Sequence, residues 1–392
     1  MSSSSQPPAL RDYPSLTDLT VGIEFEFYVH SNAIEMPAEE VTDLTARSAT
    51  VPAQRFAQAA TFVKSILDQL NLQNQVEVSN MIEAQAGRTM NETRYQTWIV
   101  TTDSALTPVL QGNTLPWLGL EVKTPIMYNR SATYRQLDRV GKALRDSAYT
   151  GFNDECGLHV HVGNGDQGFS VLTCQKLFCV LFLGGEWMLD VLFRPARHNN
   201  RNCLPMAEQA RVLSSPNTHF YLSGEVPTEW FNSCFPQGVM PVDELRQEAI
   251  RKIWRAASVQ EFYEAVNVGY RHSVTFQHLT MGIKPTIEFR KSEGNLRLEG
   301  ETEFLLVWPR ICARLVAFAV DADLDEFRRV IAGTRAALSA PTAPERLQQF
   351  LFTIRCTDYT VQWLVYRANL LERENVQAMN GGAMGNATGQ WQ

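Results

Sequence analysis

The chain of 392 residues is long enough to bury a large core, as one big domain or two closely joined ones. Its composition, 44% hydrophobic, 20% charged and 10% aromatic, excludes disorder along the whole chain. The net charge is −7 without a dominant basic stripe, which argues against a nucleic-acid partner but leaves small anionic substrates open.

The predicted elements begin after a leader, residues 1–17, whose Ser and Pro content indicates disorder rather than a secretory signal. Alternation of apolar with polar residues predicts a strand over Thr20–His30. Further strands are predicted at 76–78, 96–101, 119–123, 157–162, 273–276 and 286–290, and helices at 50–70, 132–148, 170–192, 243–266 and 301–377. Because the two types mix without strict alternation, we expect an α+β fold with a mostly antiparallel sheet and helices packed on one face.

The longest apolar stretch, residues 177–192, is shorter than the roughly 20 residues of a membrane span and is broken by glycines and acidic residues. It predicts a buried helix and no membrane partner. Seven scattered cysteines argue against a disulfide framework. With no secretory signal, we expect a cytoplasmic protein.

The predicted first strand carries two carboxylates, Glu24 and Glu26, on one face, with Cα atoms about 6.5–7 Å apart. Carboxylates so placed repel, and a pair of magnesium ions would balance them. The ordinary alternative is the exposed polar face of an edge strand.

Two histidines, His159 and His161, share one face of a later strand, a pattern typical of a metal or phosphate site. The preceding Cys156 makes a zinc site conceivable, although no Cys-x-x-Cys pair supports it. A buried structural histidine is the alternative for either residue alone.

Three further segments place charged groups on strands. Glu288 and Arg290 share a face, as a surface ion pair or as a metal ligand beside a phosphate clamp. Glu121 and Lys123 share another, and Asp103 lies where a strand gives way to a loop. Taken together, these strands predict a sheet face that binds metal ions and polyphosphate.

These motifs, in this order, resemble the amidoligase family that is common in fungi and bacteria: Gly22-Ile-Glu-Phe-Glu26, Trp98-x4-Asp103, Glu121-Val-Lys-Thr-Pro125, Cys156-Gly-Leu-His-Val-His161 and Ile287-Glu-Phe-Arg-x-x-Glu-Gly294. That family is similar to glutamine synthetase and glutamate–cysteine ligase, which implies a glutamine-synthetase-like catalytic fold. The resemblance covers residues 18–320, the expected catalytic domain. Within it, the irregular stretch 194–239 is a candidate substrate lid. A C-terminal helical part, 321–378, and a disordered tail, 379–392, follow.

The resemblance implies a role for each matching position. Metal ligands are expected at Glu24, Glu26, Glu121, His159 and Glu288. His161 is expected to contact phosphate and Arg290 to stabilise the transferring phosphoryl group, with Lys291 as a further nucleotide contact. The groups expected to act in catalysis are Arg290, Glu288 and His161. No counterpart of the synthetase ammonium loop or adenine pocket is evident.

The activity implied is an ATP-dependent ligase that uses Mg²⁺, or Mn²⁺, and joins a carboxylate to an amine through an acyl phosphate. Its partners would be small-molecule or peptide carboxylates and amines, and the sequence fixes neither their identity nor the oligomeric state. Two alternatives remain at this point. One is a metal-dependent hydrolase or oxidase that uses His159 and His161. The other is a non-catalytic binding protein with the same fold.

Overall fold

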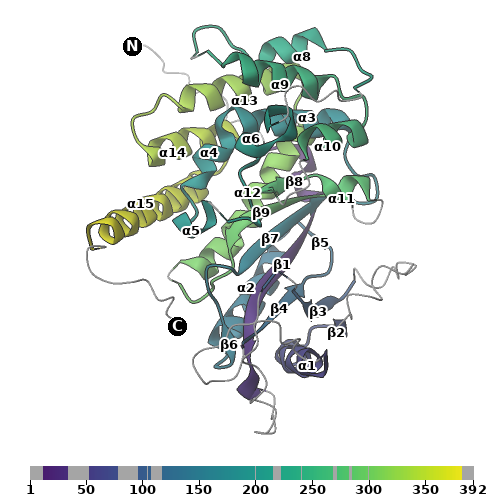
Figure 1. Ribbon diagram of the computed structural model, residues 1–392, viewed down its shortest axis with the longest axis vertical. Coiled ribbons are helices and arrows are strands. Elements are labelled where there is room, and N and C mark those ends of the chain that lie inside the picture. The colour runs from purple at the N-terminus through teal and green to yellow at the C-terminus, as the bar shows by residue number, and fades with distance from the viewer. Residues whose placement is uncertain are drawn as a thin grey trace, which may run out of the picture.

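The computed structural model describes residues 12–33, 53–77, 96–103, 105–106, 117–198, 200–214, 222–239, 241–267, 272–281, 285–298 and 300–381. Within these ranges a nine-stranded sheet runs in the order β2-β3-β4-β1-β7-β9-β8, and β5 and β6 also pair with β1 (Figure 1). Only the β2–β3 pairing is parallel among the described strands. The predicted α+β class with an open, mostly antiparallel sheet is confirmed.

The strands are short except for the central β1. They are β1 (Thr20–His30), β2 (Asn74–Glu77), β3 (Trp98–Thr102), β4 (Trp117–Lys123), β5 (Met127–Tyr128), β6 (Thr150–Gly151), β7 (Gly157–Gly163), β8 (Val274–Thr275) and β9 (Thr286–Glu293). In β1 the odd-numbered residues Val21, Ile23 and Phe25 are buried in the core, so Glu24 and Glu26 emerge on the opposite face.

Helices cover the core face and fill the upper half of Figure 1. The longer ones are α1 (Ala53–Gln69), α2 (Ser131–Asp146), α3 (Val171–Val180), α9 (Glu244–Trp254), α10 (Val259–Val266), α12 (Glu301–Asp321), α13 (Leu324–Ala337), α14 (Ala343–Thr353) and α15 (Asp358–Gly381). The short ones are α4 (Glu186–Asp190), α5 (Pro195–His198), α6 (Met206–Gln209), α7 (Arg211–Ser214), α8 (Thr228–Ser233) and α11 (Gln277–Thr280).

Helical periodicity explains how the core-face layer packs. In α2 the buried residues Tyr134, Leu137 and Val140 recur every three residues and form one apolar stripe. This helix contacts α12, which in turn contacts β1, β7 and β9, while α1 contacts β3 and β4. The sequence predicted helices on one face of the sheet only. The opposite face is partly covered as well, because α5 and α11 contact β9.

The predicted helix over 170–192 is interrupted at its centre. A π-helical turn, Leu181–Gly185, joins α3 to α4, and Gly184 has the positive φ of 144° that glycine tolerates. Among the described residues, one helical stretch, Val171–Asp190, is long and apolar enough to cross a membrane. Because 83% of its apolar window is buried inside the protein, it resembles the core helix that the sequence predicted.

The predicted disordered leader is wrong for residues 12–17, and residues 1–11 lie outside the described residues. Pro14–Thr17 forms a 3₁₀ turn. Tyr13 is buried and its hydroxyl donates to Glu326 at 3.0 Å, so this segment packs on the C-terminal helices. Farther along, the boundary expected at residue 320 falls inside α12, and α15 continues to Gly381, inside the expected tail. The stretch 194–239 contains the four short helices α5 to α8.

Candidate metal and phosphate centre

Strand register gathers the charged side chains on the face opposite the core. Directly paired residues on neighbouring antiparallel strands point to the same side. Glu24 of β1 pairs with Lys123 of β4 and with His159 of β7, which makes one row across three strands. A second row pairs Glu26 with Glu121.

A third row lies on the other side of Glu24. Gly22 pairs with His161, and His161 pairs with Glu288 of β9. The three rows therefore bring together carboxylates, imidazoles and one ammonium from four strands. Residues two apart in one strand therefore lie in different rows: Glu24 and Glu26 in the first and second, and His159 and His161 in the first and third.

His159 lies at the centre of this cluster, surrounded by three carboxylates. Its Nδ1 is 3.3 Å from Glu24 Oε2 and 3.5 Å from Glu288 Oε1. Its Nε2 is 3.2 Å from Glu26 Oε1. Burial and the nearby positive charge of Arg290 lower the pKa of His159 to about 4. The imidazole is therefore neutral at pH 7, the form that binds metal ions.

The two carboxylates nearest to His159 Nδ1 stay ionised. Burial alone would raise the pKa of Glu24, but Lys123 and the two histidines hold it well below its usual range. Burial also opposes ionisation of Glu288, and the Arg290 guanidinium overcomes it, so the pKa of Glu288 is low. Two ionised carboxylates beside a neutral imidazole form a donor set suited to a divalent cation.

Two further carboxylates, Glu26 and Glu121, lie toward β3, where too few positive charges are near to keep them ionised. Burial, together with the negative charges of Asp103 and Glu121, raises the pKa of Glu26 well above its usual value. Burial and the charge of Glu24 raise the pKa of Glu121 to about 8. Carboxylates perturbed in this way favour either a proton or a bound cation.

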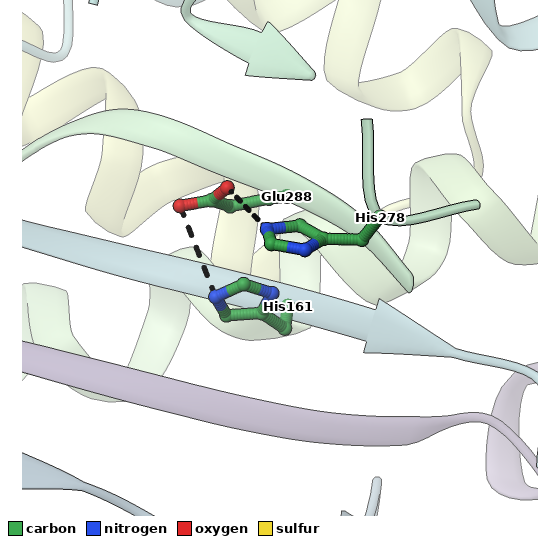
Figure 2. A group of neighbouring side chains, drawn as sticks. All are labelled: His161, His278 and Glu288. Atoms are coloured by element: carbon green, nitrogen blue, oxygen red, sulfur yellow. Dashed lines mark hydrogen bonds and ion pairs between the residues drawn. The ribbon is translucent and has the colours of Figure 1, made fainter. Parts of the chain in front are cut away.

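A third imidazole, His278 of α11, completes the centre, although sequence reasoning missed it. Figure 2 shows one carboxylate oxygen of Glu288 joined to His278 and the other to His161. His278 Nε2 is 3.0 Å from Glu288 Oε2, and His161 Nε2 is 3.8 Å from Glu288 Oε1. Thr286 Oγ1 lies 3.2 Å from Nδ1 on the other side of the His161 ring, while the buried His161 Nε2 lies 3.3 Å from Glu24 Oε1.

A β-bulge in β9 sets the position of Arg290. The β7–β9 register shifts between Leu158 and Val160, so two residues of β9 face His159. Arg290 pairs with Glu288 on the site face, and its Nε donates to the Asn202 carbonyl at 3.2 Å. Arg197 of α5 supports the bulge, because its guanidinium donates to the Arg290 carbonyl at 3.0 Å and to the Lys291 carbonyl at 3.3 Å.

Lys291, next to Arg290 in the strand, lies away from the site. Its ammonium is 2.6 Å from Asp190 of α4, the side chain is only 3% exposed, and it lines neither pocket described below. Lys291 is thus the one predicted site residue that lies outside both pockets, and its contact with a nucleotide stays a prediction.

Cys156 does not support the zinc alternative. Burial raises the pKa of its thiol far above the usual value, and the thiol donates to Asn153 Oδ1 at 3.4 Å. A neutral buried thiol that packs with Tyr28 and Leu106 is a core residue rather than a metal ligand.

Two pockets adjoin on this face. A charged pocket of about 280 Å³ is lined by Glu24, Glu26, Thr102, Asp103, Glu121, Lys123, His159, Thr275, Gln277, His278, Glu288 and Arg290. A hollow of about 350 Å³ with mostly apolar walls lies at the end of β1 and shares Glu24 and Lys123 with the charged pocket. Its walls include Ile126, Tyr128 and Pro285, and small residues such as Gly22 leave the space open.

The donor atoms fit a metal ion. Ligand atoms of Glu24, His159 and Glu288 lie within 4.8 Å of one another, and so do those of His161, His278 and Glu288. The buried His161 Nε2 faces the same carboxylates, 3.3 Å from Glu24 Oε1. The structure thus brings together seven of the eight predicted site residues: Glu24, Glu26, Glu121, His159, His161, Glu288 and Arg290.

Comparison with known families shows to which family the chain belongs. The family model described as "Putative amidoligase enzyme" matches residues 17–218. The chain belongs to the amidoligase family. This membership implies a ligase-type enzyme. The comparison with curated proteins gives no match. The family match ends at residue 218, before β9, and therefore does not include Glu288 and Arg290 of the amidoligase. The pairing of β9 with β7 brings these two residues to the centre.

Proposed function

We propose that this amidoligase is an ATP- and Mg²⁺-dependent carboxylate–amine ligase with a glutamine-synthetase-like catalytic fold. The observation that carries the proposal is the Glu24–His159–Glu288 cluster on an antiparallel sheet, with Lys123 on one side and Arg290 on the other. Divalent cations between basic side chains are the arrangement that phosphoryl transfer requires.

The residues divide into holders of metal and holders of phosphate. Glu24, His159 and Glu288 would hold one Mg²⁺, and Glu26 and Glu121 would hold a second beside Asp103. Bound Mg²⁺ would neutralise the charge of the ATP phosphates. His161 would contact a phosphate oxygen through Nε2, because Thr286 Oγ1 lies against Nδ1 on the other side of the ring at 3.2 Å.

The apolar hollow supplies a place for the nucleotide base. It adjoins the charged pocket through Glu24 and Lys123, so one ligand can span both pockets. Apolar walls with a few polar groups are typical of sites that bind a planar heterocycle. Because the two pockets adjoin, we assign the base to the hollow and the phosphates to the charged pocket.

The reaction would proceed in two balanced steps. An oxygen of the substrate carboxylate attacks the γ-phosphorus, and the bond to the β-phosphate oxygen breaks with its electron pair, releasing ADP. The amine nitrogen then attacks the acyl carbon, phosphate leaves, and the nitrogen loses a proton. Arg290 would stabilise the charge on the transferring phosphoryl group.

A phosphate-release assay tests the function. Purified protein with Mg²⁺ and ATP is incubated with pairs drawn from amino acids, short peptides and diamines. We expect amine-dependent release of phosphate from at least one pair, with a matching amide product by mass spectrometry. Glu24→Gln serves as the control and should release none. If no pair gives phosphate above the control, the ligase proposal is wrong.

A second candidate function is a metal-dependent hydrolase or oxidase. The His161–His278–Glu288 group favours it, because two imidazoles and one carboxylate are ligands typical of zinc or non-haem iron. Elemental analysis of protein purified without chelator separates the two functions. A stoichiometric transition metal supports the hydrolase or oxidase, and weakly held Mg²⁺ supports the ligase. A non-catalytic binding protein would show neither phosphate release nor stabilisation by ATP.

A further inference from the structure

Lys123 stands between the two pockets. It is the last residue of β4, directly opposite Glu24, and it lines both the charged pocket and the apolar hollow. Its Nζ is 3.1 Å from Glu24 Oε1 and 2.8 Å from Glu121 Oε1. The side chain is 25% exposed, twice the 12% of either glutamate, so its ammonium is the more accessible partner.

The ammonium offers hydrogen bonds at this position. It contacts two carboxylates, Glu24 and Glu121, and a lysine ammonium has three donor hydrogens. Phosphate oxygens are acceptors that suit such a donor.

Metal binding would change what Lys123 neutralises. Glu24 Oε2 is the oxygen nearest His159, whereas Lys123 contacts Oε1. The two proposed cations, one held by Glu24 and the other by Glu121, would supply the positive charge that the ammonium supplies without them. The lysine can then pair with an anionic ligand at the same junction without leaving either carboxylate unbalanced.

The other permanent cation of the charged pocket cannot reach this junction in the same way. Arg290 is on β9, two strands from Glu24, and it is held by Glu288 and by the Asn202 carbonyl. Among the described residues that line the apolar hollow, Lys123 is the single lysine or arginine.

We infer that Lys123 is a phosphate ligand of the nucleotide, which it holds where the apolar hollow meets the metal centre. This inference rests on the proposed function. It gives Lys123 the nucleotide contact that the sequence had assigned to Lys291, and it separates two cationic roles. Lys123 contributes to the affinity for the bound triphosphate, and Arg290 contributes to the transition state.

Calorimetric titration with Mg²⁺ and the non-hydrolysable analogue AMP-PNP, and separately with AMP, tests the assignment. For Lys123→Met we expect about tenfold weaker binding of AMP-PNP, the loss of one charged hydrogen bond. AMP, which lacks the β- and γ-phosphates, should lose less than about twofold. Lys142→Met is the matched control, because Lys142 is exposed and pairs with Asp138 on α2, and it should bind both ligands normally.

The outcomes separate the two proposals. If the wild type does not bind AMP-PNP, the proposed function fails. Suppose instead that the wild type binds AMP-PNP. The phosphate role is then wrong if Lys123→Met binds AMP-PNP as tightly as the wild type, or if its affinity for AMP falls as much as its affinity for AMP-PNP; Lys123 would then only balance the glutamates. Melting temperatures check folding, and if Lys123→Met does not fold, the same comparison with Lys123→Gln decides.

Discussion

At the scale of single residues, the centre gathers five carboxylates around two permanent cations, Lys123 and Arg290. His159 touches three carboxylates, and two further carboxylates, Asp103 and Glu121, line the same pocket. Ionised groups so close together disfavour one another's charged forms. Substitutions here should therefore affect ligand binding and turnover more than they affect the fold.

Arg290→Ala should lower turnover far more than nucleotide affinity. The guanidinium is expected to meet charge that develops on the transferring phosphoryl group, so we expect kcat to fall by about 10²–10³-fold. Affinity for Mg²⁺-AMP-PNP should change by less than about threefold on the same reasoning. Steady-state kinetics and calorimetry measure the two quantities. Equal losses in both would show that Arg290 contributes to uniform binding instead.

His272, which lies outside the centre, should make the stability of the protein depend on pH. The side chain is 2% exposed, neither ring nitrogen has a hydrogen-bond partner among the described residues, and burial lowers its pKa to about 4. Between this value and the ordinary 6.5, the unfolded chain binds a proton that the folded chain does not. Its contribution to the free energy of unfolding, at most about 3 kcal/mol, is therefore lost as pH falls from 6.5 to 4.

Denaturant unfolding of the wild type and of His272→Leu at pH 7, 5.5 and 4 measures this effect. The free energy of unfolding should fall less steeply with pH in the variant, because the titrating group is gone. Parallel curves for the two proteins would assign the acid sensitivity to other groups.

Single residues also show what the sequence can and cannot predict. Glu24, Glu26, His159 and His161 were predicted to share a face because strand side chains alternate with a period of two. Lys291 was misplaced because its assignment did not follow that period: the residue after Arg290 points to the other face of a regular strand. His278 was missed because it lies on the four-residue helix α11 and has no partner at a telling spacing.

At the scale of elements, the bulge in β9 is held by a residue from an irregular segment. Arg197 is 1% exposed and donates to the carbonyls of Arg290 and Lys291, which the shifted strand pairing leaves available. Through these contacts α5 supports the part of β9 that carries Arg290. The rest of the proposed lid over 194–239 stays a prediction.

Arg197→Met should disturb both folding and activity. Buried carbonyls that lose a charged donor cost about 1–3 kcal/mol each, so the free energy of unfolding should fall by several kcal/mol. Turnover should fall as well, because Arg290 is attached to the bulge. Arg201→Met, an exposed arginine of the same segment, is the control and should leave both unchanged. A stable, fully active Arg197→Met protein would contradict this role.

The short helices α5 to α8 explain why 194–239 was predicted to be irregular. Each has four to six residues, too few for a periodic apolar stripe. They depend on tertiary contacts, such as the Glu186 carboxylate that accepts from the Met206 and Ala207 amides at the start of α6. By contrast, long periodic elements such as β1 and α2 were located from sequence within a few residues, whereas the helical stretch predicted over 301–377 consists of α12, α13, α14 and α15.

At the scale of the whole molecule, the N-terminal segment ties the first strand to the helical C-terminal third. Tyr13 donates to Glu326, Arg355 lies over its ring at 4.8 Å, and the Ser15 amide donates to Asp321 at 2.9 Å. The segment thus bridges the predicted catalytic domain and the predicted C-terminal part, which pack as neighbours through α12.

Tyr13→Ala should destabilise the protein by about 3 kcal/mol, the usual cost of removing a buried aromatic side chain. Tyr13→Phe keeps the ring and removes the hydrogen bond with Glu326, so it should cost about 1 kcal/mol. Thermal unfolding measures both. If the two variants melt at the wild-type temperature, the N-terminal segment contributes nothing to the assembly of the two parts.

The strand order also has a consequence during synthesis. β7 pairs on one side with β1, which is made earlier, and on the other with β9, whose first residue Thr286 follows Gly163 by 123 residues. At a ribosomal rate of about 5–20 residues per second, the outer edge of β7 waits roughly 6–25 s for its neighbour. During that interval an apolar strand edge is open to strands of other nascent chains, so the yield of native protein should depend on chaperones that cover it.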